Sequence, residues 1–197
     1  MSAAESAAPP SDDSGPSVEE LVRHAQGGDG AAFNQLVRRY AGRVTRLVAR
    51  FVRSEADLAE VAQDVFVKAH RGLGSFRAES PFEHWLLRIA TRRCHDYLRA
   101  QYRRRWFTSF DHLQDQGFEP ATSAAEETDP RLPALRAAVR RLRPDDRTVI
   151  TLLELEEHSV REVAALTGWT ESKVKVRAHR ARRALRRDLE SFNPPPL

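Results

Sequence analysis

The chain is 197 residues long, with 32 Lys and Arg against 28 Asp and Glu, and its formal net charge is +4 at pH 7. This length suits one domain or two small ones, and the positive charge favours a polyanionic partner without identifying it. The lone Cys94 excludes an internal disulfide and a multi-cysteine zinc site, no apolar run approaches a membrane span, and no signal-peptide core precedes the first helix, so we expect a cytoplasmic protein.

The N-terminal part of the chain passes from a polar tail into helical patterns. Residues 1–17 combine Ala, Ser, Pro and acidic side chains without an apolar period, so we expect a disordered tail. A short helix is predicted over 18–26, ended by Gly27 and Gly28, and Asp29 then caps a longer helix. Apolar residues recur along one face of that helix, which predicts a core face. They are Phe33, Leu36, Val37, Tyr40, Val44, Leu47, Val48 and Phe51.

Three carboxylates share one face of the next predicted helix, which begins at Ser54. Asp57, Glu60 and Asp64 lie at i, i+3 and i+7, opposite an inward face that contains Val61. A metal site is one interpretation, but the di-metal pattern of helical bundles needs Glu-x-x-His pairs, which the sequence lacks. A solvated acidic face and a ridge for a basic protein partner both remain open on this pattern alone.

A loop and a long helix come next. Phe76 stands among polar residues and glycines in the predicted loop over 72–79, and Ser80, Pro81 and Glu83 then supply the N-cap, N1 and N3 residues of a helix. Its predicted buried side consists of Leu86, Ile89, Ala90, Cys94 and Leu98. Its other sides interleave cations with aromatic rings, namely Trp85, Arg88, Arg92, Arg93, His95, Tyr97, Arg99, Tyr102 and residues 103–106. Such a pattern predicts binding of single-stranded nucleic acid, because cations follow phosphates and rings stack on bases; the alternative is that Trp85 and Tyr97 are core aromatics.

The next stretch changes in composition. Residues 107–131 are acidic and rich in Gly, Pro, Ser and Thr, which predicts a flexible linker. An amphipathic helix is then predicted over 132–142, and Pro144, Asp145 and Asp146 start another. The core of that helix is predicted to be Val149, Ile150, Leu152, Leu153 and Leu155. Glu154, Glu156, Glu157 and His158 could suggest acid–base catalysis, but they adjoin a predicted DNA-binding motif and no cleft signal accompanies them.

The most informative stretch spans residues 158–185. Ser159 and Glu162 form a capping box for a short helix, Gly168 supplies a turn, and Thr170 can cap a second helix. The second helix has an apolar stripe, formed by Val174, Ala178, Ala181 and Leu185. Its opposite side carries Ser172, Lys175, Val176 and His179, and Arg180, Arg183 and Arg187 continue that side toward the end of the helix. From Lys173 to Arg187 no residue is acidic, whereas solvated faces usually mix both signs of charge. A helix-turn-helix that places this helix in a DNA major groove is therefore favoured.

These motifs resemble, in this order, the extracytoplasmic-function sigma factors of bacterial RNA polymerase over about residues 18–190. The matching segments are FNQLVRRY, DLAEVAQDVFVKAH, FRAESPFEHWLLRIATRRCHDYLR and the helix-turn-helix. The resemblance implies an all-α protein of two small domains on a flexible acidic linker: a region 2 domain over 18–106, a linker over 107–131 and a region 4 domain over 132–190, followed by a tail over 191–197. The linker would thread near the RNA exit path, where its acidic residues could mimic nucleic acid, or act as a plain tether.

The resemblance also implies roles for particular residues. Asp57, Glu60, Val61 and Asp64 would bind the β′ clamp helices of core polymerase. Phe76 would pocket a flipped base of the minus-ten element, with the helix after it holding the melted strand through Trp85, Arg88, Arg92, Arg93 and Arg99. Base edges of the minus-thirty-five element would be contacted by Lys175, Val176 and His179. Its phosphates would be contacted by Lys173, Arg177, Arg180 and Arg183, and Ser172 would also bind this element.

Two departures from the family pattern bear on promoter choice: Arg92 stands where an Asn is common, and Val176 where a small hydroxyl residue is common.

The further expected partners are the polymerase β flap and an anti-sigma factor, without membrane insertion, cofactor or metal. The main rival prediction is a free-standing helix-turn-helix regulator, which would leave the acidic ridge unexplained. A nuclease is disfavoured, because the sequence lacks a phosphate-cradling glycine motif, a metal-ligand spacing and a nucleophile–base pair.

Overall fold

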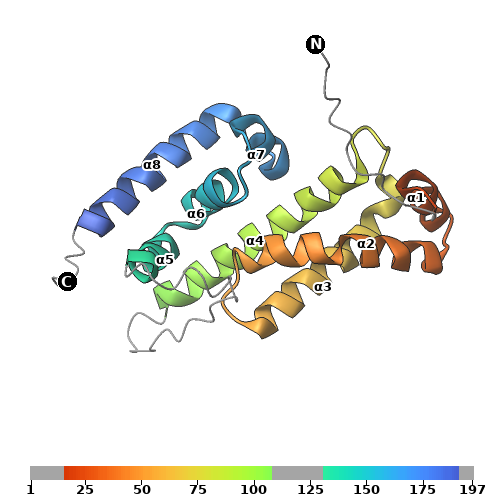
Figure 1. The fold of residues 1–197 in the computed structure, drawn as a ribbon, viewed down its shortest axis with the longest axis horizontal. Coiled ribbons are helices and arrows are strands. Elements are labelled where there is room, and N and C mark those ends of the chain that lie inside the picture. The colour runs from red at the N-terminus through yellow and green to blue at the C-terminus, as the bar shows by residue number, and fades with distance from the viewer. Residues whose placement is uncertain (1–15, 108–130, 191–197) are drawn as a thin grey trace, which may run out of the picture.

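A computed structural model describes residues 16–107 and 131–190, and those residues are helical without a strand (Figure 1). The N-terminal unit contains α1 (Val18–Gln26), α2 (Gly30–Ala49), α3 (Glu55–Gly72), the short 3₁₀ helix η1 (Leu73–Ser75) and α4 (Phe82–Phe107). The C-terminal unit contains α5 (Arg131–Arg141), α6 (Pro144–Ile150), the π-helical segment η2 (Thr151–Leu155), α7 (Val160–Thr167) and α8 (Glu171–Glu190). The predicted all-α class is confirmed, while the expectations for residues 1–15, 108–130 and 191–197 lie outside the described residues.

Side-chain caps begin the first three helices; those at Asp29 and Ser54 are at the predicted places, whereas Ser17 was assigned to the tail. Ser17 forms a capping box with Glu20, and Asp29 Oδ1 accepts hydrogen bonds from the N–H groups of Ala31 at 2.8 Å and Ala32 at 3.1 Å. Ser54 Oγ accepts from the Asp57 N–H at 3.0 Å. Each such cap is worth about 1 kcal/mol, because it satisfies an N–H that the helix leaves unpaired.

The core of the N-terminal unit consists of the predicted apolar faces. Fully buried side chains from α2, α3 and α4 meet there, together with Phe51 from the turn after α2. They include Leu36, Val44, Leu47, Val48, Val65, Leu86 and Phe51. Burying each side chain of this size contributes roughly 1.5–3 kcal/mol of transfer free energy, so this core fixes how α4 is presented.

The start of α4 differs from the prediction by one residue. The helix begins at Phe82, and the Pro81 carbonyl accepts the first helical hydrogen bond, from the Trp85 N–H at 3.3 Å. Pro81 therefore occupies the N-cap position instead of N1. Proline is tolerated there because the position needs no N–H donor within the helix.

A π turn, which the sequence did not predict, separates α6 from α7. The Glu156 N–H donates to the Thr151 carbonyl, five residues earlier, at 3.1 Å. A π turn accommodates one more residue than an α turn, so it shifts the face on which the following side chains lie. Leu155, predicted to be core, is consequently 46% exposed, which corrects that prediction.

The helix-turn-helix has the predicted local geometry. Ser159 and Glu162 form the capping box, Gly168 ends α7 in the left-handed conformation at φ 76°, and the Thr170 hydroxyl accepts from the Lys173 N–H at 3.2 Å. The residues Val174, Ala178 and Ala181 are buried against the rest of the unit, as the stripe on α8 predicted. The opposite side of α8 is left exposed.

The two units pack against each other, with α6 and α7 lying between α8 and α4 (Figure 1). One continuous hydrophobic core joins residues of α4 to Val149, Leu152 and Val163 of the C-terminal unit. The Arg147 guanidinium donates a buried hydrogen bond to the Phe51 carbonyl at 3.0 Å, across the boundary between the units. The sequence predicted two domains on a tether, and this closed arrangement between them is an additional finding.

Candidate protein-binding and nucleic-acid-binding surfaces

The predicted acidic ridge lies on α3, but its members differ in what they contact. Glu60 is exposed, Asp57 accepts a hydrogen bond from the Tyr97 hydroxyl at 2.9 Å, and Asp64 is paired with Arg93 of α4. Burial and the adjacent Asp57 raise the pKa of Tyr97 to about 12, so the phenol stays protonated and donates. Val61 is only 4% exposed and supports α3 from the core, and its contact with a partner stays a prediction.

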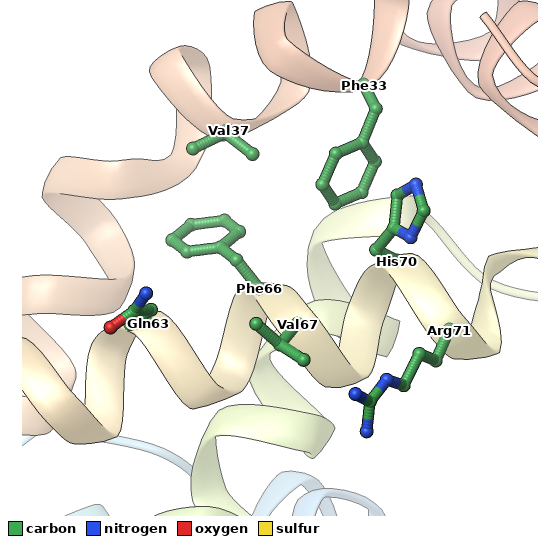
Figure 2. A pocket seen from close by; sticks show the side chains of 7 residues that line it. All are labelled: Phe33, Val37, Gln63, Phe66, Val67, His70 and Arg71. Atoms are coloured by element: carbon green, nitrogen blue, oxygen red, sulfur yellow. The ribbon is translucent and has the colours of Figure 1, made fainter. Parts of the chain in front are cut away.

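An apolar pocket of about 410 Å³ lies between α2 and α3, next to this ridge (Figure 2). Its walls come from four residues of α3 and two of α2, with the Arg71 side chain at its edge (Figure 2). They are Phe33, Val37, Gln63, Phe66, Val67 and His70. Val67 is 38% exposed, so α3 presents an apolar side chain outside the face that it buries in the core.

Three aromatic rings gather around the loop before α4. The Phe76 ring centroid lies 5.1 Å from that of Trp85 and 5.8 Å from that of Phe82. The Gln26 side-chain amide donates to the Leu73 carbonyl at 3.0 Å and to the Phe76 carbonyl at 2.8 Å, which holds the loop against α1. Phe76 and Trp85 are both half-buried, so each ring is partly core and partly available. The role of Gln26 was missed because it depends on a contact between distant parts of the chain.

The predicted cations of α4 divide between two faces. Arg88, Arg92 and Arg99 lie within about 40° of each other on the helix, whereas Arg93 points toward α3 and pairs with Asp64. The stripe of Arg88, Arg92 and Arg99 also includes His95, whose Nε2 lies 2.9 Å from Asp145 Oδ1 of α6. The His95 ring meets the Trp169 ring edge-on at 5.4 Å, so the C-terminal unit packs on this stripe.

The predicted residues of α8 also divide. Most point away from the core and are exposed, namely Ser172, Lys173, Lys175, Val176, His179, Arg180 and Arg183; Val176 is 50% exposed. Lys173 Nζ nevertheless lies 3.8 Å above the Trp169 ring, and Lys175 Nζ is 3.8 Å from Glu171. Arg177 is half-buried, with Nη2 at 3.0 Å from Asp145 and Nη1 at 3.3 Å from Asp146. In this arrangement Arg177 orients α8 and is not presented outward.

Asp145 is therefore a shared acceptor at the boundary between the units. Its burial raises the pKa, but the hydrogen bond with His95 and the charges of Arg177 and Lys173 outweigh that effect, so the pKa lies below its usual value. The carboxylate is ionised at neutral pH and holds groups from α4 and α8 at once.

Across residues 16–107 and 131–190, no group of three or more His, Cys, Asp or Glu side chains could hold a metal ion, and no helix is long and apolar enough to cross a membrane.

An all-helical architecture with a cationic recognition helix defines a protein of the helix-turn-helix class. The family model described as Sigma-70 region 2 matches residues 36–104, and the one described as Sigma-70, region 4 matches residues 132–185. The ECF RNA polymerase sigma-E factor of Escherichia coli is 39% identical over 173 residues, covering 84% of this chain and 90% of that protein. The sigma-E factor of Haemophilus influenzae is 34% identical over 180 residues, covering 87% and 95% respectively.

Solved structures agree with this relationship. CnrH, in complex with the cytosolic domain of CnrY, has a TM-score of 0.58 at 27% identity, covering 88% of this chain and 97% of that one. The sigma factor RpoE of Bartonella quintana, in complex with the anti-sigma factor NepR, has the same TM-score at 21% identity, covering 82% and 98%, which shows the shared fold. The chain belongs to the extracytoplasmic-function sigma factors, which are transcription-initiation factors and not enzymes.

Proposed function

We propose that this sigma factor acts in the cytoplasm, joins core RNA polymerase, and directs initiation by reading a minus-thirty-five element with α8 and holding a melted minus-ten element with the 72–79 loop and α4. The observation that carries the proposal is the exposed cationic side of α8, placed on a helix-turn-helix within a sigma-family chain. The sigma factor would contribute to initiation through binding free energy, while the polymerase performs phosphoryl transfer.

At the minus-thirty-five element, α8 would enter the major groove with its exposed side. Base edges would be contacted by Lys175, Val176 and His179, and phosphates by Lys173, Arg180 and Arg183. The Ser172 hydroxyl can bind a base edge or a phosphate. Val176 can contact a thymine methyl but cannot form a side-chain hydrogen bond. It would therefore favour thymine at the base pair of the minus-thirty-five element that it contacts. Arg177 reaches DNA only if it leaves Asp145 and Asp146.

At the minus-ten element, the aromatic cluster of Phe76, Phe82 and Trp85 would receive an unstacked base. Extruding a base costs a few kcal/mol, and stacking on an aromatic ring returns roughly 1–3 kcal/mol per base. Arg88, Arg92 and Arg99 share one stripe of α4 and would follow the phosphates of the same strand. Arg93 would instead support α3 through its pair with Asp64.

Simultaneous reading of both elements requires the two units to separate. The elements lie about 25 base pairs apart, which is on the order of 85 Å at a rise of 3.4 Å per pair. In the closed arrangement α7 packs directly on α4, so the DNA-reading surfaces are adjacent. We therefore infer that polymerase binding selects an open arrangement.

The partner surfaces support the same proposal. Glu60 and the pocket between α2 and α3 offer a charged edge beside an apolar surface, which suits the β′ clamp helices of polymerase. The β flap is expected to hold the C-terminal unit. CnrH and the Bartonella RpoE were each solved with a regulatory partner, and we infer that an anti-sigma factor likewise controls this chain.

The decisive experiment combines the purified chain with core RNA polymerase and genomic promoter fragments, followed by mapping of transcript starts. Specific starts that share two sequence elements at constant spacing are expected. Absence of specific initiation, with DNA binding retained, would favour the free-standing regulator instead. That alternative would give the exposed Glu60 of α3 no role, whereas Asp57 and Asp64 already have partners on α4.

A further inference from the structure

Arg43 of α2 and Arg50, the C-cap residue of the same helix, hold one carboxylate of the C-terminal unit. Arg43 Nη1 lies 2.8 Å from Glu156 Oε2, and Arg50 Nε lies 3.3 Å from Glu156 Oε1. The Glu156 side chain is only 7% exposed, although it crosses the boundary between the units. Each carboxylate oxygen thus has its own guanidinium.

These arginines belong to a longer cationic stripe on α2. Arg39, Arg43, Arg46 and Arg50 recur at i, i+4, i+7 and i+11, within an arc of about 60°. Arg43 Nε also lies 3.7 Å from Glu83, the second residue of α4. The stripe therefore begins beside the helix proposed to hold the melted minus-ten strand.

The chemistry of this cluster suits an oxyanion other than a carboxylate. A guanidinium presents donors in a planar fork that matches carboxylate and phosphate equally well. When the units separate, Glu156 leaves with the C-terminal unit and the two guanidiniums remain together, each repelling the other. A phosphate group between them would remove that repulsion, and promoter DNA supplies phosphates along the adjacent α4.

We propose that Arg43 and Arg50 form a binding site for a backbone phosphate of promoter DNA and that Glu156 occupies this site in the closed molecule. The inference rests on the proposed function, because it takes α4 as the minus-ten surface. Glu156 acts as an internal substitute for the phosphate, so closure of the units and DNA binding compete for the same two side chains. Glu83 and Glu156 together keep Arg43 from binding anions indiscriminately.

The first test uses holoenzyme, in which the proposed function requires the units to be apart. The double variant Arg43→Gln, Arg50→Gln is compared with Arg38→Gln, an exposed arginine on another face of α2, for promoter binding over a range of salt concentrations. Loss of one phosphate contact is expected to reduce the slope of log K against log salt by about 0.7–0.9. Glu156→Gln should leave this slope unchanged. A slope for the double variant equal to that of Arg38→Gln would overturn the site.

The second test uses the free chain and needs no polymerase. Labels attached through Ala59→Cys on α3 and Arg161→Cys on α7 report the distance between the units, since Cys94 is buried. Glu156→Gln is expected to lengthen that distance and to tighten binding of promoter DNA by the free chain. Glu157→Gln, the exposed neighbour, is the matched control and should change neither.

The two tests separate the possible failures. If wild-type holoenzyme initiates specifically but Glu156→Gln leaves both the distance and free-chain DNA binding unchanged, Glu156 is not the competitor and the inference fails alone. If wild-type holoenzyme shows no specific initiation, the proposed function fails, and the labelled free chain still decides whether Glu156 holds the units together.

Discussion

Side chains of one chemical type take different roles in this chain according to what lies within reach. Lys175 and Arg177 are close neighbours on α8, yet Lys175 is exposed and Arg177 is held by Asp145 and Asp146. The sequence predicted both as DNA contacts, because helical periodicity gives the face of a residue but not its partner. Asp145 is distant from Arg177 along the chain, and only the tertiary structure brings the two together.

Lys175 tests whether α8 reads bases. We expect Lys175→Ala to reduce discrimination of the minus-thirty-five element by about 1–3 kcal/mol, because its ammonium would contact a base edge. Competition binding of holoenzyme to matched and scrambled elements measures this. Equal loss on both elements would identify Lys175 as a phosphate contact, and Lys173→Ala is the comparison for that behaviour.

Glu60 is the most direct test of the acidic ridge, because Asp64 is paired with Arg93 and its replacement would also disturb α4. Glu60→Lys is expected to weaken binding to core polymerase by about tenfold, roughly 1.4 kcal/mol, through charge reversal at the partner surface. Titration of labelled full-length chain with core enzyme gives the affinity. Glu157→Lys carries the same charge change elsewhere and should bind normally.

Elements were predictable wherever their signals are local. The capping box of α7 needs only residues 159 and 162, and α2 is defined by its own apolar spacing. By contrast, η2 has no local signature: Thr151–Leu155 has ordinary helix-forming composition, and the segment lies in contact with α6 and α7. That is also why the sequence assigned Leu155 to the core.

Gly168 sets the angle between α7 and α8. Its φ of 76° suits glycine, and a Cβ there would lie 3.3 Å from Arg92 Nη2. Gly168→Ala is expected to destabilise the fold by about 1–2 kcal/mol, because side chains disfavour the left-handed conformation. Denaturant unfolding measures the loss. Gly30→Ala, at the open start of α2, is the control and should have little effect.

Three threonine hydroxyls, those of Thr91, Thr148 and Thr151, are buried without a hydrogen-bond partner among the described residues. An unsatisfied buried hydroxyl costs about 1–3 kcal/mol. We expect Thr148→Val to stabilise the chain by about 1 kcal/mol, measured as a higher denaturant midpoint. Thr45→Val, at an exposed position of α2, should not give this increase. A destabilised Thr148→Val variant would mean that the hydroxyl is hydrated.

At the scale of the whole molecule, the closed arrangement joins apolar packing to ionic contacts between the two units. His95, Asp145 and Arg177 link α4, α6 and α8, while Arg43, Arg50 and Glu156 link α2 to the segment after η2. Neither set could be predicted from the sequence, since each joins residues separated by an acidic stretch that predicts only a tether. The family resemblance predicted the two units, but not their contact.

Acidification tests the Asp145 contacts. Because its pKa is lowered in the folded state, Asp145 contributes stability that is fully present above its ordinary pKa near 3.8 and is lost as pH falls through the lower folded value. Wild type should therefore be more stable than Asp145→Asn at about pH 6, and the difference should disappear in strong acid. Unfolding by urea between about pH 2 and 6 gives both curves, with Glu157→Gln as the control.

The direction in which the Glu156 side chain points depends on the number of residues in the π-helical segment η2 before it. The hydrogen bond from the Glu156 N–H to Thr151 spans five residues, whereas an α turn spans four. Deleting one residue from Thr151–Leu155 would restore the α turn and rotate the next side chains by about 100°, which carries this carboxylate off α2. A loss of three nucleotides in the gene would thus remove the contacts of Glu156 with Arg43 and Arg50 from the closed arrangement.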